Sequence, residues 1–100
     1  MLGTAGELRG GKFGHWEGGV RSPFIIRWPA AVPAGKVNKT SITSALDWLP
    51  TIAELTGAKL LNKDIDGKSI VNVIKNDEAK TPHDVLHWQT GRGRQPRWAV

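Results

Sequence analysis

The chain has 100 residues, with 14 Lys and Arg against 9 Asp and Glu, and therefore a formal net charge of +5. Its 39% hydrophobic content is that of a globular protein, and the absence of cysteine excludes disulfides, thiolate metal sites and a cysteine nucleophile. No apolar run approaches the roughly 20 residues of a membrane-spanning helix. The first residues lack the basic and apolar regions of a signal peptide, so any export signal is expected outside this chain.

Residues 1–22 are predicted to form a loop, because they hold seven of the twelve glycines and sustain neither a helical nor an alternating pattern. Glycines at this density let a backbone turn its N–H groups toward a small ligand, and Lys12 among them indicates an anion. Residues 6–12 also satisfy the phosphate-loop pattern G-x-x-x-x-G-K. However, Phe13 replaces the Ser or Thr that binds Mg²⁺, so a nucleotide site is not expected. The alternative to an anion site is an ordinary flexible loop with a solvated lysine.

Two strands are predicted next. Residues 23–28 form an apolar run rich in aromatic and β-branched side chains, which is typical of a buried strand, and residues 40–46 alternate apolar and polar side chains. The prolines and glycine of residues 29–38 predict a surface turn between the strands. Residues 38–40 form a glycosylation sequon, a pattern that is common by chance.

Two helices are predicted in the middle of the chain. The first covers residues 47–56, with the carboxylate of Asp47 accepting the free amides of its first turn and Gly57 ending it in the left-handed conformation. The second is a short helix over residues 69–75 that begins at a capping serine.

The last part of the chain is predicted to form a strand, a loop and a second strand. Residues 85–88 form an apolar run, residues 89–96 a loop of Gly and Arg, and residues 98–100 the beginning of a further strand. The order loop, strand, strand, helix, helix, strand, strand indicates part of an α/β or α+β protein rather than a closed domain.

The candidate metal ligands are weak. His83 and His87 would lie roughly 13 Å apart on a strand, at about 3.3 Å per residue, and neither they nor His15 has a matching second set of ligands. A partly exposed histidine with a local hydrogen bond is the expected state. Asp64 and Asp66 lie in a turn without the further acids of a calcium loop, so we expect them to be solvated.

Arginines near the end of the chain raise the question of nucleic acid. Arg92, Arg94 and Arg97 lie between Trp88 and Trp98, and cations beside aromatic rings are typical of single-strand binding surfaces. A solvated loop before a buried tryptophan explains the same residues, and we favour that interpretation.

Several motifs in one order resemble the arylsulfatase-type sulfatases. The first three are L-R-G-G-K at residues 8–12, W-E-G-G-V-R-S-P at 16–23 and R-W-P at 27–29. They are followed by L-D-W-L-P-T at residues 46–51 and D-G-K-S at 66–69. The resemblance extends over essentially residues 8–100, and ordered motifs are far more specific than any one of them.

The resemblance implies an α/β fold class, as part of an alkaline-phosphatase-like sulfatase fold. Residues 1–84 would be the C-terminal part of the catalytic domain, at the end of its central sheet, and residues 85–100 the truncated start of a small C-terminal subdomain. The implied activity is hydrolysis of sulfate esters, with a formylglycine nucleophile and a divalent cation, usually calcium, in the full-length enzyme. That enzyme is expected in the periplasm or outside the cell.

The resemblance also implies the site. In this family the lysine of the glycine-rich motif contacts the substrate sulfate, so Lys12 is expected to do so, and His15 is expected to face the substrate. We call residues 8–22 the lysine loop. The other motif residues are expected to shape this loop, with the glutamate and second arginine bonded to each other or to the backbone: Gly10, Gly11, Glu17, Gly18, Gly19 and Arg21.

The departures from the family matter as much. The chain has no Cys or Ser in the C/S-x-P-x-R setting that formylglycine needs, and the family's metal-binding aspartates and Asp-Asn pair are missing. We therefore expect no metal ligand and no bound cofactor here, and a C-terminal sulfatase fragment that is inactive alone. The expected partner is a sulfate-ester substrate, with neither nucleic acid nor membrane. The alternative is a non-enzymatic basic module that binds polyanions, either nucleic acid or sulfated polysaccharide.

Overall fold

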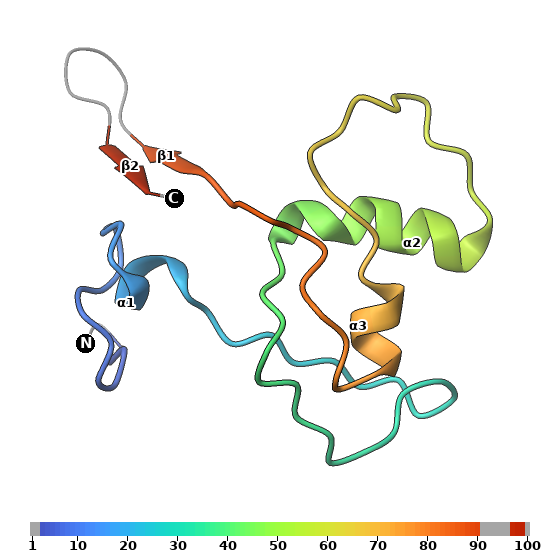
Figure 1. Ribbon diagram of the computed structural model, residues 1–100, viewed down its shortest axis with the longest axis horizontal. Coiled ribbons are helices and arrows are strands. Elements are labelled where there is room, and N and C mark those ends of the chain that lie inside the picture. Colours follow the sequence, from blue (N-terminus) through green and yellow to red (C-terminus); the bar gives the residue numbers. More distant parts are fainter. Residues whose placement is uncertain (1–2, 91–96, 100) are drawn as a thin grey trace. The chain divides into compact units, whose positions relative to one another are not determined.

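The computed structural model describes residues 3–90 and 97–99, most of them in irregular backbone (Figure 1). The chain divides into two compact units, one formed by Met1–Ile25 with Val85–Val100 and the other by Ile26–Asp84. The regular elements in chain order are α1 (Glu17–Val20), the 3₁₀ turn η1 (Ala45–Asp47), α2 (Trp48–Thr56), α3 (Val71–Lys75), β1 (Trp88–Thr90) and β2 (Arg97–Ala99).

The first unit contains α1 and a two-stranded sheet. β1 and β2 pair antiparallel, with Trp88 opposite Ala99. The sheet begins later than predicted, because residues 85–87 are irregular and the strand extends into the predicted loop. The predicted loop over residues 1–22 likewise contains one helical turn, α1. Residues 91–96 of the predicted loop and Val100 of the predicted last strand lie outside the described residues.

The second unit is built on α2 and α3, which contact each other. The prediction of a helix ending at Gly57 is confirmed, since α2 ends there and Gly57 has φ 72°. The second helix is also present but begins at Val71, two residues late. The apolar core of the described residues consists of small and β-branched side chains: Ala53, Ile70, Ile74 and Ala79.

The prediction that Asp47 caps the first turn of α2 is wrong. Its carboxylate makes no capping bond to α2 and instead accepts the backbone N–H of Ser44 at 2.7 Å. Ser44 in turn accepts the N–H of Leu46, which makes a capping box for η1. The helix therefore begins through a 3₁₀ turn, which turns the carboxylate of Asp47 toward other parts of the chain.

The predicted strands over residues 23–28 and 40–46 are wrong, because neither pairs with another segment in the described part of the chain. Their side chains suit a strand, but a strand is stable only when its backbone groups pair with a neighbour. Ile25 in the first segment is 89% exposed. The prediction that residues 1–84 and 85–100 belong to different domains of a longer enzyme stays a prediction.

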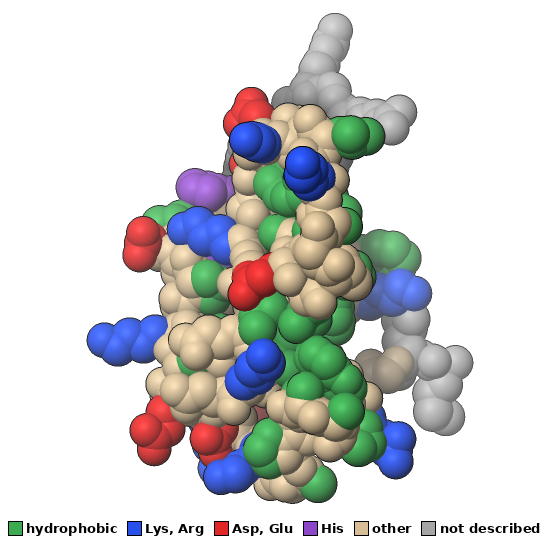
Figure 2. Space-filling view, turned by 90° about the vertical axis from the view of Figure 1, so that its right-hand side faces the viewer, with side chains coloured by type: hydrophobic (Ala, Val, Ile, Leu, Met, Phe, Trp, Pro, Cys, Tyr) green, Lys and Arg blue, Asp and Glu red, His purple; other side chains and the backbone are tan. Residues whose placement is uncertain are grey.

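Much of the apolar side-chain surface lies outside the core. Figure 2 shows one face of the molecule, on which apolar side chains reach the surface between charged ones. On α2, Leu49 is 58% and Ile52 is 52% exposed. Among the described residues, no helix has the length and apolar character to cross a bilayer.

Candidate functional site

The lysine loop is folded closely on itself. The N–H of Gly18 donates to the carbonyl of Arg9 at 2.8 Å and closes the loop around Lys12. A Cβ on Gly18 would lie 2.7 Å from the carbonyl oxygen of Gly10, and a Cβ on Gly19 would overlap backbone of the same loop. The glycines of W-E-G-G are therefore required by packing, because the backbone fills the space that a side chain would need.

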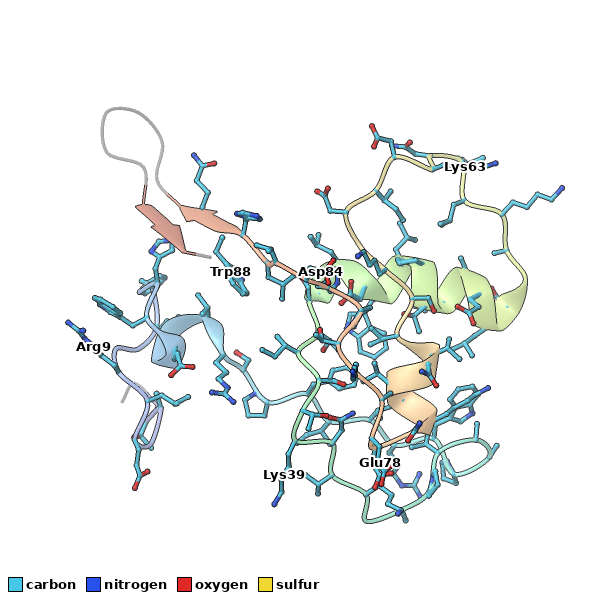
Figure 3. The ribbon with its side chains drawn as sticks, viewed as in Figure 1. Arg9, Lys39, Lys63, Glu78, Asp84 and Trp88 are labelled. Atoms are coloured by element: carbon cyan, nitrogen blue, oxygen red, sulfur yellow. The ribbon has the colours of Figure 1, made fainter. Side chains whose placement is uncertain are left out.

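The beginning of the loop is fixed to Trp16. The guanidinium carbon of Arg9, which is labelled in Figure 3, lies 3.6 Å from the centroid of the Trp16 ring. Gly10 between them has φ 85°, and a Cβ there would lie 2.8 Å from the Cβ of Trp16. This cation–π contact and the close approach at Gly10 hold the two halves of the loop together.

Glu17 and Arg21 lie side by side across α1. Nη1 of Arg21 donates to Oε1 of Glu17 at 3.1 Å, and the backbone N–H of Arg21 donates to the carbonyl of Glu17 at 2.8 Å. Both side chains are exposed, so the ion pair itself contributes about 0.5 kcal/mol or less. The structure brings these two predicted residues together at the end of the loop.

Lys12 is exposed, and its ammonium nitrogen lies 5.2 Å from the ring centroid of Phe13. Phe13 has φ 71°, in the left-handed region, and is 84% exposed. The left-handed residue turns the backbone directly after Lys12. The result is an accessible cation at the tip of a loop whose base is held by close backbone contacts.

A cavity of about 290 Å³ has Phe13, the residue that follows Lys12, in its lining. His15 is half-buried in its wall, and Trp88 of β1, labelled in Figure 3, is another part of the lining. Lys12 itself is not among the lining residues. They come from the lysine loop, α1 and β1: Phe13, Gly14, His15, Gly19, Val20, Trp88 and Gln89.

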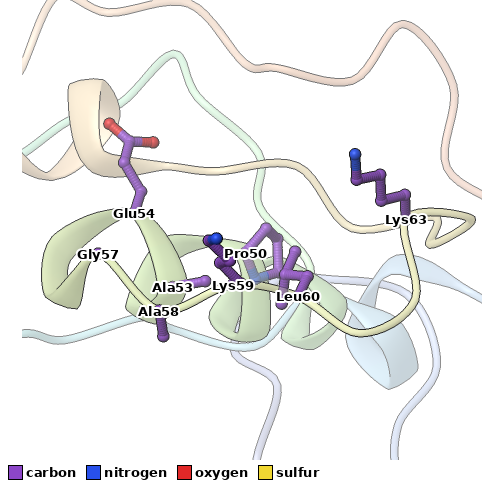
Figure 4. A pocket seen from close by; sticks show the side chains of 8 residues that line it. All are labelled: Pro50, Ala53, Glu54, Gly57, Ala58, Lys59, Leu60 and Lys63. Carbon is purple, nitrogen blue, oxygen red and sulfur yellow. The ribbon is translucent and has the colours of Figure 1, made fainter.

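A second hollow of about 640 Å³ lies in the other unit, along α2 and the segment that follows it (Figure 4). It is lined by Pro50 and Ala53 together with charged side chains such as Glu54, Lys59 and Lys63. Most of this lining is solvent-exposed. None of the residues predicted for the sulfate site contributes to it.

A buried polar centre was not predicted. Asp47 is fully buried, and its Oδ1 accepts the backbone N–H of Lys68 at 2.9 Å and lies 2.7 Å from Nε2 of His83. Thr51 extends the centre, because its hydroxyl donates to the carbonyl of Asp47 and accepts the N–H of Ile70 at 2.9 Å. The signal in the sequence was the pair of motifs at residues 46–51 and 66–69, which meet here.

The electrostatics of Asp47 follow from these bonds. Burial alone would raise the pKa of the carboxyl, but the N–H groups of Ser44 and Lys68 and the ring of His83 outweigh it, so that the pKa is lowered. The side chain of His83 is only 7% exposed. Asp47 and His83 are therefore part of a structural centre of the second unit, and the carboxylate of Asp47 is ionised at neutral pH.

The remaining candidate ligands do not assemble. His83 bonds to Asp47, whereas His87 is exposed, and so are Asp64 and Asp66. Within residues 3–90 and 97–99, no three His, Asp or Glu side chains are close enough together to hold a metal ion. These residues thus do not fit the divalent cation that the family resemblance implies for the whole enzyme.

Comparison with known proteins decides the family. The model of "N-sulphoglucosamine sulphohydrolase, C-terminal" matches residues 12–90, from Lys12 to the end of β1. The chain belongs to this sulfatase family. The resemblance to sulfatases that the ordered motifs indicate is therefore confirmed.

Several curated sulfatases are similar over most of the chain. Steryl-sulfatase of Mus musculus is 38% identical over 100 residues, which cover 98% of this chain and 16% of the relative. Arylsulfatase D of Homo sapiens is 39% identical over 92 residues, 90% of this chain and 15% of the relative. A sulfatase of Formosa agariphila is 36% identical over 85 residues, 81% of this chain and 15% of the relative.

The chain thus spans about a sixth of the length of the curated sulfatases that it matches. The comparison with solved structures found no significant match.

Proposed function

We propose that the lysine loop supplies a sulfate-contacting wall to the active site of a sulfuric ester hydrolase, with Lys12 as the contact. The observation that carries the proposal is the accessible ammonium of Lys12 on a loop held by glycine packing. Membership of the sulfatase family supports it.

The chemistry suits an ammonium at this position. Hydrolysis of a sulfate ester breaks the bond between sulfur and the ester oxygen, and negative charge grows on the leaving oxygen as the sulfuryl group is transferred. A lysine on a flexible stem can follow that charge with its three N–H donors. Loss of one preorganised contact of this kind commonly lowers the rate by about 10²- to 10³-fold.

His15 is the second residue that we assign to the substrate. Its half-buried ring lines the same cavity as Phe13, the residue after Lys12, and we propose that an ester bound to the ammonium extends into this cavity. An imidazole there can exchange a hydrogen bond with an oxygen of the bound ester. This role is one of contact and orientation.

The isolated 100 residues are proposed to be inactive. The nucleophile and metal of sulfatases need a formylglycine and a cluster of carboxylates, and the described residues contain no metal-binding cluster. Purified chain incubated with an aryl sulfate should release no product above the buffer rate.

The test of the proposal is anion binding. Titration of the ¹⁵N-labelled chain with inorganic sulfate should shift the amide signals of the lysine loop, and Lys12→Ala should weaken the affinity at least about tenfold. Lys63→Ala, at an exposed lysine of the other unit, is the matched control and should leave the affinity unchanged. Equal affinity of Lys12→Ala and the unsubstituted chain would overturn the assignment.

The same titration distinguishes the proposed sulfate contact from the alternative, a basic module that binds polyanions. Its supporting observation is the net charge of +5. Binding by distributed charge would weaken slightly with either lysine substitution and would fall steeply with salt. Selective loss with Lys12→Ala favours the sulfatase role.

A further inference from the structure

Residues 77–83, which we call the strap, contain no helix or strand but lie along residues 36–47 of the same unit. Figure 3 labels Lys39 and Glu78 on these two segments. Every second residue of the strap is joined to the other segment through a side chain, and the partners follow the same order along both: Asp77 with Lys36, Ala79 with Asn38 and Ser41, Thr81 with Ile42, and His83 with Asp47. Side chains thus hold the segments together where a strand would use backbone pairs.

Asn38 is the centre of this junction, because its amide group is bonded on both sides. Its Oδ1 accepts the backbone N–H groups of Thr40 and Ser41 at 2.9 and 2.8 Å. Its Nδ2 donates to Oγ of Ser41 at 3.1 Å and to the carbonyl of Ala79 at 3.3 Å. An asparagine amide has two hydrogens, so both are committed while the strap is in place.

Asn38 is also the first residue of the N-x-T pattern at residues 38–40, the acceptor pattern for N-linked sugars. Sugar transfer forms a bond between Nδ2 and C1 of a nucleotide-activated sugar. The bond between C1 and the phosphate oxygen breaks, the nucleotide leaves with its electron pair, and one hydrogen of Nδ2 leaves as a proton. Nδ2 then keeps a single hydrogen, and the sugar occupies a side from which Ser41 or Ala79 has to move.

We infer that Asn38 is an acceptor for an N-linked sugar that is available only when the strap opens, so that sugar attachment and strap closure exclude each other. In the closed strap, neither hydrogen of Nδ2 is free for the transfer, and one of them is bonded to Ala79, which is 5% exposed. A bulky sugar cannot share that side. The contacts lie within one unit and do not involve the lysine loop, so the inference is independent of the proposed sulfate contact.

Sugar transfer to the full chain tests this inference. The probe is a purified soluble N-glucosyltransferase that recognises N-x-S/T, supplied with UDP-glucose, and intact-mass spectrometry follows the gain of one hexose. The strap-opening variant Ser41→Ala/Thr81→Val keeps residues 38–40 but loses both hydroxyl bonds between the segments. We expect it to be modified at least about tenfold faster than the unsubstituted chain, in which transfer must wait for local opening.

The matched control makes the same two types of substitution outside the strap. Thr56→Val/Ser69→Ala removes hydroxyl groups that make only local bonds, and this variant should be modified as slowly as the unsubstituted chain. Thr40→Ala destroys the acceptor pattern and should gain no hexose, which places the reaction at Asn38.

A global loss of structure would also expose Asn38, so near-ultraviolet circular dichroism is measured for each variant. If the strap-opening variant has lost that signal, Thr81→Val alone decides, because it breaks a single bond and should still be modified faster than Thr56→Val. Equal rates for the unsubstituted chain and the strap-opening variant, whether both are fast or both are zero, would overturn the inference. Equal rates for Thr81→Val and Thr56→Val would do the same in the second comparison.

Discussion

At the scale of single residues, Asp47 is the group whose surroundings say most about the fold. Its buried carboxylate receives bonds from Ser44, Lys68 and His83, which lie 3, 21 and 36 residues away in the chain. Local reasoning could identify an acid before a helix, but it could not find partners that only the folded chain brings together. This is why Asp47 was predicted as a helix cap and His83 as a partly exposed histidine.

The bonds to Asp47 predict a dependence of stability on acid. Its pKa in the folded chain lies below the ordinary value of 3.8, so folding favours the ionised form. This stabilisation is fully present above the ordinary pKa and is lost as the pH falls through the lower pKa of the folded state. The free energy of unfolding should therefore decrease as the pH drops below about 4. Thermal unfolding followed by near-ultraviolet circular dichroism at pH 6, 4 and 3 measures this.

Asp47→Asn is the control for the acid dependence. It keeps the shape and one acceptor oxygen but removes the charge, and we expect it to lower the free energy of unfolding at pH 7 by about 2–3 kcal/mol. Its stability should then change less between pH 6 and pH 3 than that of the unsubstituted chain. Parallel curves for the two proteins would show that other carboxyl groups cause the acid dependence.

At the scale of elements, helices and strands were predicted with different success. The end of α2 is coded locally, by apolar side chains on one face and Gly57 after the last turn. The segments over residues 23–28 and 40–46 have strand-like side chains, but no segment of the described chain pairs with them. The segment over 40–46 is instead anchored by side chains, since Ser41 donates its hydroxyl to the carbonyl of Ala79.

The lysine loop is an element whose composition was predicted but whose contacts were not. The high glycine content indicated a tight backbone, yet it did not reveal which glycine is required by contact. A Cβ at Gly19 would meet the carbonyl oxygens of Gly14 and Gly11, the latter at 2.7 Å, whereas a Cβ at Gly11 would meet nothing within 4 Å. The two positions therefore differ sharply within one motif.

We expect Gly19→Ala to open the loop, because backbone atoms cannot give way as a flexible side chain could. The substitution should lower the free energy of unfolding by about 2 kcal/mol or more, as is typical of overpacking. Two-dimensional NMR should show loss of the dispersed amide signals of residues 9–20 in this variant, and sulfate binding should weaken with it. Gly11→Ala is the matched variant and should keep the spectrum of that segment. Similar spectra for both variants would contradict the contacts described at Gly19.

At the scale of the whole molecule, the balance between core and exposed apolar surface is unusual. The buried apolar side chains of the described residues are Ala53, Ile70, Ile74 and Ala79, so little apolar area stabilises the fold. Large apolar side chains are exposed on α2, at Leu49 and Ile52. Family membership could be predicted from ordered motifs, but this distribution could not, because motifs do not say which apolar groups the 100 residues bury.

The exposed side of α2 predicts how the chain behaves in solution. Because Leu49 and Ile52 are more than half exposed, replacing both with lysine removes little packing and should leave the thermal midpoint within about 3 °C, as expected for surface changes. The double variant should bind less of an apolar fluorescent dye than the unsubstituted chain and should self-associate less in sedimentation experiments. Ile70→Ala, at a side chain that is 1% exposed, should instead lower the free energy of unfolding by about 3 kcal/mol. If the double lysine variant unfolds as Ile70→Ala does, α2 packs through Leu49 and Ile52 in solution, and the exposure described for this helix is wrong.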